Sequence, residues 1–336
     1  MFSNRDRPTL RLNQLQKYAV LRLLGQGTVS TVYMAEDTTV PVDPRVRCIA
    51  IKRFNVDNED PGRQEGVILE MLKGSEYIVD CYGAFRIQDS YVLALQLLDC
   101  SRQLRLDSVP TSFSRGDQAY ASSTYGQGYK IIAKIALQML RAIRDINAKG
   151  LLHGDIKPGN VMFEYGHQHK IRLIDFGNAA LLSHLDAYHG DYEIQSMGYR
   201  APEVLLGDQS FNEKIDLWST GVVLLELYVN TQYQGHEQEY RLINSPQRSD
   251  AVCQIITSIG SVDCYRKAKF WQPLYEFENH RENMAPLWPS LKDHNGGTHD
   301  QLLLVDFLQA LLQPDHTKRP SVDKLLNHPF LTQLLN

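Results

Sequence analysis

Hydrophobic and polar residues in the first third of the chain follow the pattern typical of β-strands. Four runs rich in β-branched and aromatic residues are separated by polar or Pro-containing breaks such as TTVPVDPR. We predict strands within residues 18–37, 47–54, 77–87 and 91–98. The N-terminal part of the chain is therefore expected to be mainly a β-sheet.

One helix is expected between the second and third runs. Asp60 followed by Pro61 is typical of an N-cap and the first helical position. Gly66 inside this helix costs about 1 kcal/mol relative to alanine; it loosens the helix, is a harmless local flaw, or makes a close packing contact. The apolar face is expected to comprise Val67, Ile68, Met71 and Leu72.

Helical spacing dominates the rest of the chain. Residues 107–128 are rich in Ser, Thr and Gly, which predicts a loop, and Gly150 is expected to end the helix that follows. The apolar positions of that helix are Ile132, Ile135, Ala136, Met139, Ile143 and Ile146. The sequence predicts an α+β fold in two lobes. We expect one domain over 18–330, with lobes of about 18–98 and 99–330 and short flanks at 1–17 and 331–336.

Composition and charge limit the binding partners and the cellular compartment expected of this protein. The formal net charge of the 336 residues is −4, so no global basic field favours nucleic acid or a membrane surface as a partner. The five cysteines are scattered and never spaced as CxxC, which fits reduced thiols inside the cell. No apolar stretch is long enough for a signal peptide or a membrane span. We expect a soluble intracellular protein, cytoplasmic or nuclear.

A glycine-containing turn, GQGTVS, joins the first two predicted strands. Gly25, Gln26 and Gly27 begin it, and Ser30 stands where a third glycine would complete the GxGxxG pattern. Because the chain continues as a strand rather than a helix, the pattern favours a β-hairpin whose backbone lies over nucleotide phosphates. An ordinary hairpin turn is the alternative.

A lysine lies in the apolar strand IAIK. Burial of Lys52 is costly unless its ammonium group meets an anion, although the side chain could instead extend to the surface. Glu65, early in the predicted helix, is the candidate partner. Glu70 is the competing candidate, but its spacing fits less well.

The stretch HGDIKPGN, residues 153–160, has the side chains required for phosphoryl transfer. An aspartate can accept a hydroxyl proton, a lysine can neutralise the transferring group, and an asparagine can bind a divalent ion. Asp155, Lys157 and Asn160 supply these groups. The apolar run IRLIDFG then ends in Asp175, a candidate Mg²⁺ ligand. Each residue alone could be a solvated loop residue, but their order and spacing together indicate a phosphoryl-transfer site.

The sequence resembles the eukaryotic protein kinase family from about Tyr18 to Phe330. The resemblance rests on the glycine turn, the strand lysine, HGDIKPGN, DFG, APE at 201–203 and DLWSTG at 216–221. Arg319 resembles the arginine that pairs with the glutamate of APE, here Glu203. APE, DLWSTG and Arg319 are the features that separate protein kinases from small-molecule phosphotransferases.

This resemblance implies roles for individual residues and implies ATP and Mg²⁺ as cofactors. Asp155 would orient or deprotonate the substrate hydroxyl and Lys157 would steady the γ-phosphate. Asn160 and Asp175 would hold the metal, and Lys52 would hold the α/β-phosphates. Val32, Ala50 and Met162 would enclose the adenine, with Leu95 at the gatekeeper position and backbone groups of Gln96 and Leu98 bonding to the base. Plain core packing is the alternative for the three apolar residues.

IQSMGYRAPEVLLG, with DFGNA and DLWSTG, resembles the CMGC group, and within it the dual-specificity tyrosine-regulated, homeodomain-interacting and SR-protein kinases. DIKPGN resembles serine/threonine kinases, so a protein substrate with a Ser or Thr acceptor and a monomeric enzyme are expected. Two residues depart from the group. Met197 replaces a usual arginine, which argues against proline direction, and Glu193 stands where relatives often carry an activating tyrosine.

Gly154 replaces the arginine that, in the family, binds a phosphorylated activation segment. We expect a competent kinase that does not depend on phosphorylation of that segment, where Tyr188 and Tyr192 are the possible phosphosites. A catalytically weak or inactive kinase-fold scaffold is the alternative, since Gly154 and Ser30 both depart from the family pattern.

Overall fold

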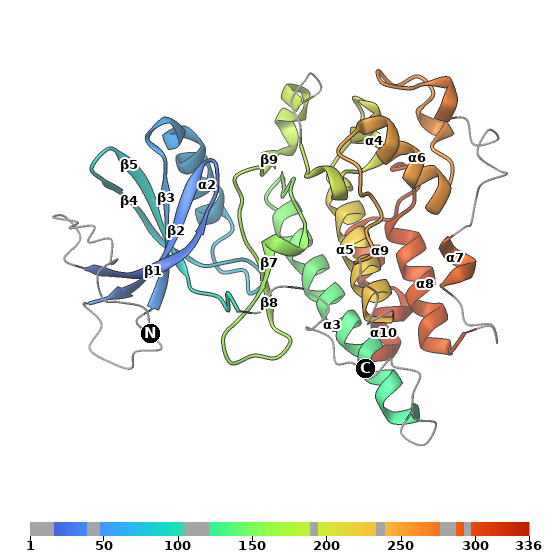
Figure 1. Ribbon diagram of the computed structural model, residues 1–336, viewed down its shortest axis with the longest axis horizontal. Helices are drawn as coiled ribbons and strands as arrows, with labels where there is room; N and C mark the ends of the chain where they lie inside the picture. Colours follow the sequence, from blue (N-terminus) through green and yellow to red (C-terminus); the bar gives the residue numbers. More distant parts are fainter. Residues whose placement is uncertain are drawn as a thin grey trace.

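The computed structural model of the protein describes residues 17–38, 48–101, 104, 121–188, 194–232, 239–275, 287–291 and 297–335. A β-sheet with one helix against it forms one end of the molecule, and a larger, mainly helical part forms the other (Figure 1). The α+β architecture in two parts is the predicted one.

The sheet is antiparallel, and its five strands lie in the order β1-β2-β3-β5-β4. The strands are β1 (Tyr18–Gln26), β2 (Ser30–Asp37), β3 (Cys48–Phe54), β4 (Cys81–Ile87) and β5 (Ser90–Gln96). Every predicted run contains a strand, but β4 begins at Cys81 rather than at residue 77. The preceding residues pair with the helical part instead, because Ile78 forms a parallel bridge with Leu173.

Helix α2 (Glu59–Met71) packs against β4 and β5. Its predicted start is wrong: Asn58 is the N-cap, and Asp60 and Pro61 lie in the first turn. Its apolar face is also only half correct. Ile68 and Leu72 are buried, whereas Val67 and Met71 are 62% and 37% exposed.

Two glycines explain why α2 turns a different face towards the sheet than the apolar residues predict. A Cβ on Gly62 would lie 2.8 Å from the ring of Phe54, and one on Gly66 would lie 3.0 Å from the hydroxyl of Tyr91. The face of α2 that carries Gly62 and Gly66 therefore lies close against the sheet. A prediction based on apolar side chains alone does not detect a buried face made of glycines. Of the three interpretations of Gly66, the structure supports the close packing contact.

The helical part is built around two long helices. Its helices are α3 (Ala121–Asn147), α4 (Pro202–Leu206), α5 (Ile215–Gln232), α6 (Arg248–Ser258), α7 (Leu287–Ser290), α8 (His299–Leu311), α9 (Val322–Leu326) and α10 (Pro329–Leu335). All six apolar positions predicted for α3 are fully buried. α3 packs against α5, α8, α9 and α10. None of the helices in the described ranges is both long and apolar enough to cross a membrane.

The loop predicted over 107–128 is wrong in its last part. α3 already begins at Ala121, and residues 107–120 lie outside the described part of the chain. A helix that is already formed can extend into Ser-rich sequence, because each added residue gains one hydrogen bond and the cost of nucleating the helix is not incurred again. At the other end α3 stops at Asn147, and Gly150 takes a φ of +69° in the turn that follows.

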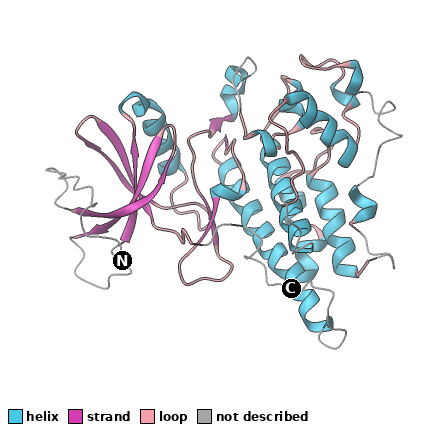
Figure 2. Ribbon diagram, in the orientation of Figure 1, coloured by secondary structure: helices cyan, strands magenta, loops and turns pink. Residues whose placement is uncertain are grey.

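Short strands lie between the sheet and the long helices (Figure 2). β6 (Leu151–Leu152) pairs with β9 (Ala180–Leu181), and β7 (Val161–Phe163) pairs with β8 (Ile171–Leu173). Short 3₁₀ helices cover Val56–Asn58, Pro158–Asn160, Leu182–Tyr188, Met197–Tyr199, Asp263–Tyr265 and Pro273–Tyr275. The strand pairs bring the HGDIKPGN loop and the DFG segment together.

Candidate active site

A cleft of about 520 Å³ lies between the sheet and the helical part. It is lined by every predicted cofactor-binding residue, namely Gly25, Gln26, Gly27, Val32, Ala50, Lys52, Glu65, Gln96, Leu98, Met162 and Asp175, and by Asn160 and Leu95. Sequence reasoning missed other lining residues, including Leu24, Val79, Leu97, Cys100 and Ile174. Their apolar character is the same as that of core residues, so the sequence held no signal for them.

The glycine turn is a hairpin, as predicted. Gln26 of β1 faces Thr31 of β2, and the N–H of Gly27 donates to the carbonyl of Ser30 at 2.9 Å. A Cβ on Gly25 would meet no atom within 4 Å. The bare backbone therefore leaves open space above the cleft, which a phosphate chain could occupy.

Lys52 on β3 is buried and lies between two carboxylates. Its Nζ donates to Oε1 and Oε2 of Glu65 at 2.8 and 2.7 Å and to Oδ1 of Asp175 at 2.8 Å. Glu65 is the predicted partner, and the competitor Glu70 instead pairs with Lys73 at the surface. The pairing joins α2 to the sheet and both to the DFG segment.

Burial and charge compete in this cluster. Burial lowers the pKa of Lys52, but the carboxylates of Glu65 and Asp175 outweigh it, and the net shift is upward. Burial also raises the pKa of Asp175, yet Lys52 holds that pKa below its usual range. Lys52 therefore stays a cation and Asp175 an anion at neutral pH, the states needed to bind phosphate and metal.

The backbone of the HGDIKPGN loop is fixed by a buried carboxylate on α5. Oδ2 and Oδ1 of Asp216 accept from the N–H groups of His153 and Gly154 at 2.6 and 3.0 Å. The ring of His153 packs against Phe176 with centroids 4.7 Å apart. The backbone of the loop is thus bound to α5, and its histidine ring packs against the DFG phenylalanine.

The side chain of Asp155 is buried and accepts hydrogen bonds at both oxygens. Oδ2 accepts from Nζ of Lys157 at 2.7 Å and from Nδ2 of Asn160 at 3.2 Å. Oδ1 accepts from the N–H of Ser196 at 3.1 Å and from its hydroxyl at 2.7 Å. Donors to both oxygens fix the orientation of this carboxylate beside the cleft.

Ser196 was not predicted as a site residue. Its hydroxyl bridges Asp155 and Nζ of Lys157, which donates to it at 2.9 Å. A serine in a loop 41 positions from the aspartate carries no local pattern, so only the folded chain reveals the contact.

Two oxygen donors suited to a metal line the cleft together. Asn160 uses Nδ2 to bond to Asp155, which leaves its carbonyl oxygen as a donor, and Asp175 uses only Oδ1 to bind Lys52. The N–H of Ile174 donates to the carbonyl of Asn160 at 3.0 Å, which holds the two segments side by side. No group of three or more His, Cys, Asp or Glu side chains within the described residues could hold a metal. Two protein donors suit Mg²⁺, which completes its shell with phosphate and water oxygens.

Gly154 occupies a position that excludes a side chain. Its φ is +73°, and a Cβ would lie 2.5 Å from the carbonyl oxygen of Asn178. The N–H of Gln195 donates to the carbonyl of Gly154 at 2.9 Å, so the loop is joined there to the segment before APE. Among the residues singled out in that segment, Tyr192 and Glu193 lie outside the described part of the chain.

A buried ion pair closes the end of the same segment, as predicted. Nη1 of Arg319 lies 2.7 Å from Oε1 of Glu203, and both side chains are fully buried. The guanidinium group also donates to the carbonyls of Gln313 and Lys214. APE is thereby tied to the C-terminal helices.

Comparison with known families agrees with this geometry. Residues 18–331 match the family model of the protein kinase domain. The chain therefore belongs to the protein kinase domain family, and its two-lobed α+β fold is the fold of that family. The family resemblance predicted from the sequence is confirmed, and membership supports phosphate transfer to protein substrates. The CMGC subgroup stays a prediction.

Proposed function

We propose that this chain is an active serine/threonine protein kinase that transfers the γ-phosphate of ATP with the aid of Mg²⁺. The observation that carries the proposal is the buried Asp155 carboxylate, which contacts Lys157, Asn160 and Ser196. Adjacent to it is the cleft that contains Lys52 and Asp175.

Each residue then has a role in the transfer. Lys52, oriented by Glu65, binds the α/β-phosphates, and Asn160 and Asp175 hold the metal. Bound Mg²⁺ supplies neutralisation of phosphate charge. Asp155 orients the acceptor hydroxyl and takes its proton, while Lys157 neutralises the γ-phosphate. Gly25, Gln26 and Gly27 cover the phosphates, the adenine lies between Val32, Ala50 and Met162, and backbone groups of Gln96 and Leu98 bond to it.

Preference for serine and threonine, and a CMGC-like subgroup, are proposals supported by DIKPGN and by IQSMGYRAPEVLLG. That the enzyme is a monomer and acts inside the cell is likewise a proposal. The five cysteines are free, which supports a reducing compartment.

The test is Mg²⁺-dependent transfer of γ-phosphate from ATP to a generic basic protein, with the wild type compared with Asp155→Asn. We expect transfer by the wild type and a loss of about 10³-fold or more in the variant, since both the base and its charge are removed. ATP binding by the variant should be unchanged, because Asp155 does not line the cleft. No transfer by either protein, with ATP still bound, would favour the scaffold alternative.

We also propose that activity does not depend on phosphorylation of the activation segment. The support is that Gly154 offers no cation for a phosphate, whereas uncharged contacts from Gln195 and Ser196 already hold the segment to the catalytic loop. Replacing Tyr188 and Tyr192 together by Phe should leave activity within about twofold. Abolished activity in a folded double variant would overturn this proposal.

A further inference from the structure

Two glycines lie on the face of α2 that packs against the sheet. Gly62 and Gly66 are four positions apart and therefore lie one above the other on the helix, and Glu65 stands between them in the sequence. Neither glycine has a positive φ. The backbone at both positions would therefore accept alanine, which forms helices better than glycine. What requires glycine here is the space around each residue.

The sheet residues that contact these glycines also surround Lys52. Phe54 follows Lys52 by two positions on β3, so both side chains lie on the same side of the sheet, and Nζ of Lys52 is 5.3 Å from the centre of the Phe54 ring. Leu93 on β5 is the direct cross-strand partner of Lys52, and Tyr91 precedes Leu93 by two positions. The glycine face of α2 thus packs on the area of the sheet from which Lys52 extends.

The space between helix and sheet cannot hold a methyl group. A Cβ at position 62 would lie 2.8 Å from the ring of Phe54 and 2.9 Å from that of Tyr91. A Cβ at position 66 would lie 3.0 Å from Oη of Tyr91 and 3.1 Å from Leu93. Phe54 and Leu93 are buried, and the rings of Phe54 and Tyr91 pack together with centroids 6.3 Å apart. Because this side of the sheet is close-packed, an added methyl group should push the helix outward.

The ion pair between α2 and the sheet tolerates little outward movement of the helix. Nζ of Lys52 lies 2.8 and 2.7 Å from the two oxygens of Glu65, whose side chain is 1% exposed. Since such hydrogen bonds weaken beyond about 3.2 Å, an outward shift of about half an ångström should weaken both. Lys52 would then be held mainly by Asp175, its other carboxylate partner.

We infer that Gly62 and Gly66 are positioning residues for phosphate transfer, which set the distance between α2 and the sheet so that Glu65 reaches Lys52. The inference rests on the proposed kinase activity. The missing side chains on this face bring the helix into its catalytic position, and the surface that receives the helix is formed by Phe54, Tyr91 and Leu93 of the chain itself.

The test is a double-mutant cycle on Mg²⁺-dependent transfer from ATP, with Gly62→Ala, Glu65→Gln and the combination of both. Gly62→Ala alone should lower kcat/KM for ATP about tenfold, because a displaced Glu65 no longer orients Lys52. In Glu65→Gln the ion pair is already lost, so adding Gly62→Ala should lower activity by less than about twofold more. Equal losses in the two backgrounds would overturn the inference, because a merely structural effect of the methyl group does not depend on Glu65.

Tyr91 provides a second measurement that separates the two glycines. Tyr91→Phe removes the hydroxyl beside Gly66 but leaves the ring carbon beside Gly62 in place. It should therefore restore part of the activity lost in Gly66→Ala and none of the activity lost in Gly62→Ala. Lack of recovery in Gly66→Ala would exclude the proposed role of that glycine. If Gly62→Ala does not fold, the cycle with Glu65→Gln is carried out on Gly66→Ala, whose Cβ meets the outer end of Tyr91.

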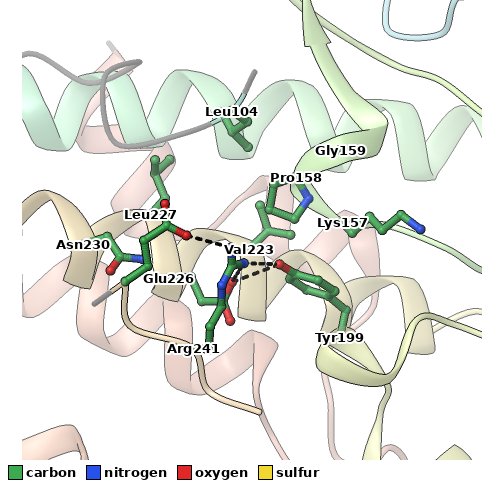
Figure 3. Close-up of a pocket in the computed structure, with 11 residues that line it drawn as sticks. Leu104, Lys157, Pro158, Gly159, Tyr199, Val223, Glu226, Leu227, Asn230 and Arg241 are labelled. Atoms are coloured by element: carbon green, nitrogen blue, oxygen red, sulfur yellow. Dashed lines mark hydrogen bonds and ion pairs between the residues drawn. The ribbon is translucent and has the colours of Figure 1, made fainter. Parts of the chain in front are cut away.

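The matched control on the same helix is Val67→Ala, because Val67 is 62% exposed. This variant should have the activity of the wild type. The KM for a protein substrate should stay constant in all variants, since the substrate must approach beside the catalytic loop. A cavity of about 350 Å³ opens there at Lys157, Pro158 and Gly159, and no residue of α2, β3 or β5 is among its described lining residues (Figure 3).

The outcomes separate this inference from the proposed function. Unchanged kinetics in a folded Gly62→Ala variant, with an active wild type, would overturn the inference and leave the proposed kinase activity standing. No transfer by the wild type would overturn the proposed function, and this inference with it.

Discussion

Lys52 and Asp175, 123 positions apart in the chain, form an ion pair with 2.8 Å between Nζ and Oδ1. Glu65 holds the other side of the same ammonium group. The lysine is thus shared between the carboxylate that orients it and the carboxylate expected to bind Mg²⁺.

Replacing Glu65 should leave the ammonium group of Lys52 with a single carboxylate partner. In Glu65→Gln, Lys52 keeps Asp175 as its carboxylate partner, so the ammonium group competes more strongly with Mg²⁺. We expect kcat to fall about tenfold or more and the Mg²⁺ concentration for half-maximal activity to rise. Steady-state assays over a Mg²⁺ series measure both. Glu70→Gln, a surface residue on the same helix, should change neither; an equal effect of the two substitutions would exclude this explanation.

Ser196 should act on catalysis rather than on nucleotide binding. Ser196→Ala removes the hydroxyl that donates to Asp155 and accepts from Lys157, so kcat should fall about tenfold. KM for ATP should not change, because Ser196 does not line the nucleotide cleft. Ser196→Thr keeps the hydroxyl and should recover activity. Lack of recovery in a folded Thr variant would count against the hydroxyl as the active feature.

Gly154 and Gly150 form a matched pair for measuring close contact. Both have positive φ, +73° and +69°, but only a Cβ on Gly154 meets other atoms, at Asn178 and Ile194. Gly150→Ala should cost about 1–2 kcal/mol of unfolding free energy from backbone strain alone. Gly154→Ala should cost a further 1–3 kcal/mol or so from overpacking. Denaturant unfolding compares the two, and equal losses would show that the contact is relieved at no cost.

The buried pair of Arg319 and Glu203 should dominate stability at the end of the activation segment. Arg319→Met leaves a buried carboxylate without its cation, which should cost about 3–5 kcal/mol. Combining it with Glu203→Leu should recover part of this loss. Lys73→Met breaks the exposed pair with Glu70 and should cost at most about 1 kcal/mol. Thermal unfolding of the three variants and the wild type tests the ranking, and an Arg319→Met variant no less stable than Lys73→Met would contradict it.

Acid should weaken the ion pair between Glu164 and Arg172. Burial raises the pKa of Glu164, but hydrogen bonds from Arg172 and Lys170 outweigh this and bring it below the usual value. A carboxyl with a lowered folded pKa contributes stability above its unfolded pKa of about 4.3, and loses it as pH falls through the folded value. The difference in melting temperature between wild type and Glu164→Gln should therefore be constant near pH 7 and shrink below about pH 4.3. A difference in melting temperature that grows as the pH falls would contradict the lowered pKa of Glu164.

The sequence predicted the elements whose signal is local and periodic. The buried face of α3, the hairpin at Gly25 and the pairing of Lys52 with Glu65 all follow from spacing along the chain or from one short motif. Val67 and Met71 were misplaced because α2 is rotated by close contacts at Gly62 and Gly66, which depend on the sheet opposite.

Long-range contacts were beyond the sequence for a similar reason. The bridging hydroxyl of Ser196 depends on segments that meet only after folding. The same is true of the crowding at Gly154, since Asn178 lies in another segment. None of these residues stands in a pattern that indicates its partner.

Asp216 binds the catalytic loop through backbone N–H groups of His153 and Gly154, and so contacts no side chain of either residue there. Every amino acid other than proline provides the same N–H group. The support beneath Asp155 therefore comes from the main chain and does not depend on side-chain chemistry. The need for glycine at position 154 has a different origin, because the carbonyl of Asn178 and the side chain of Ile194 leave no room there for a Cβ. The anchorage of the loop and the exclusion of a cationic side chain at position 154 thus arise from separate contacts.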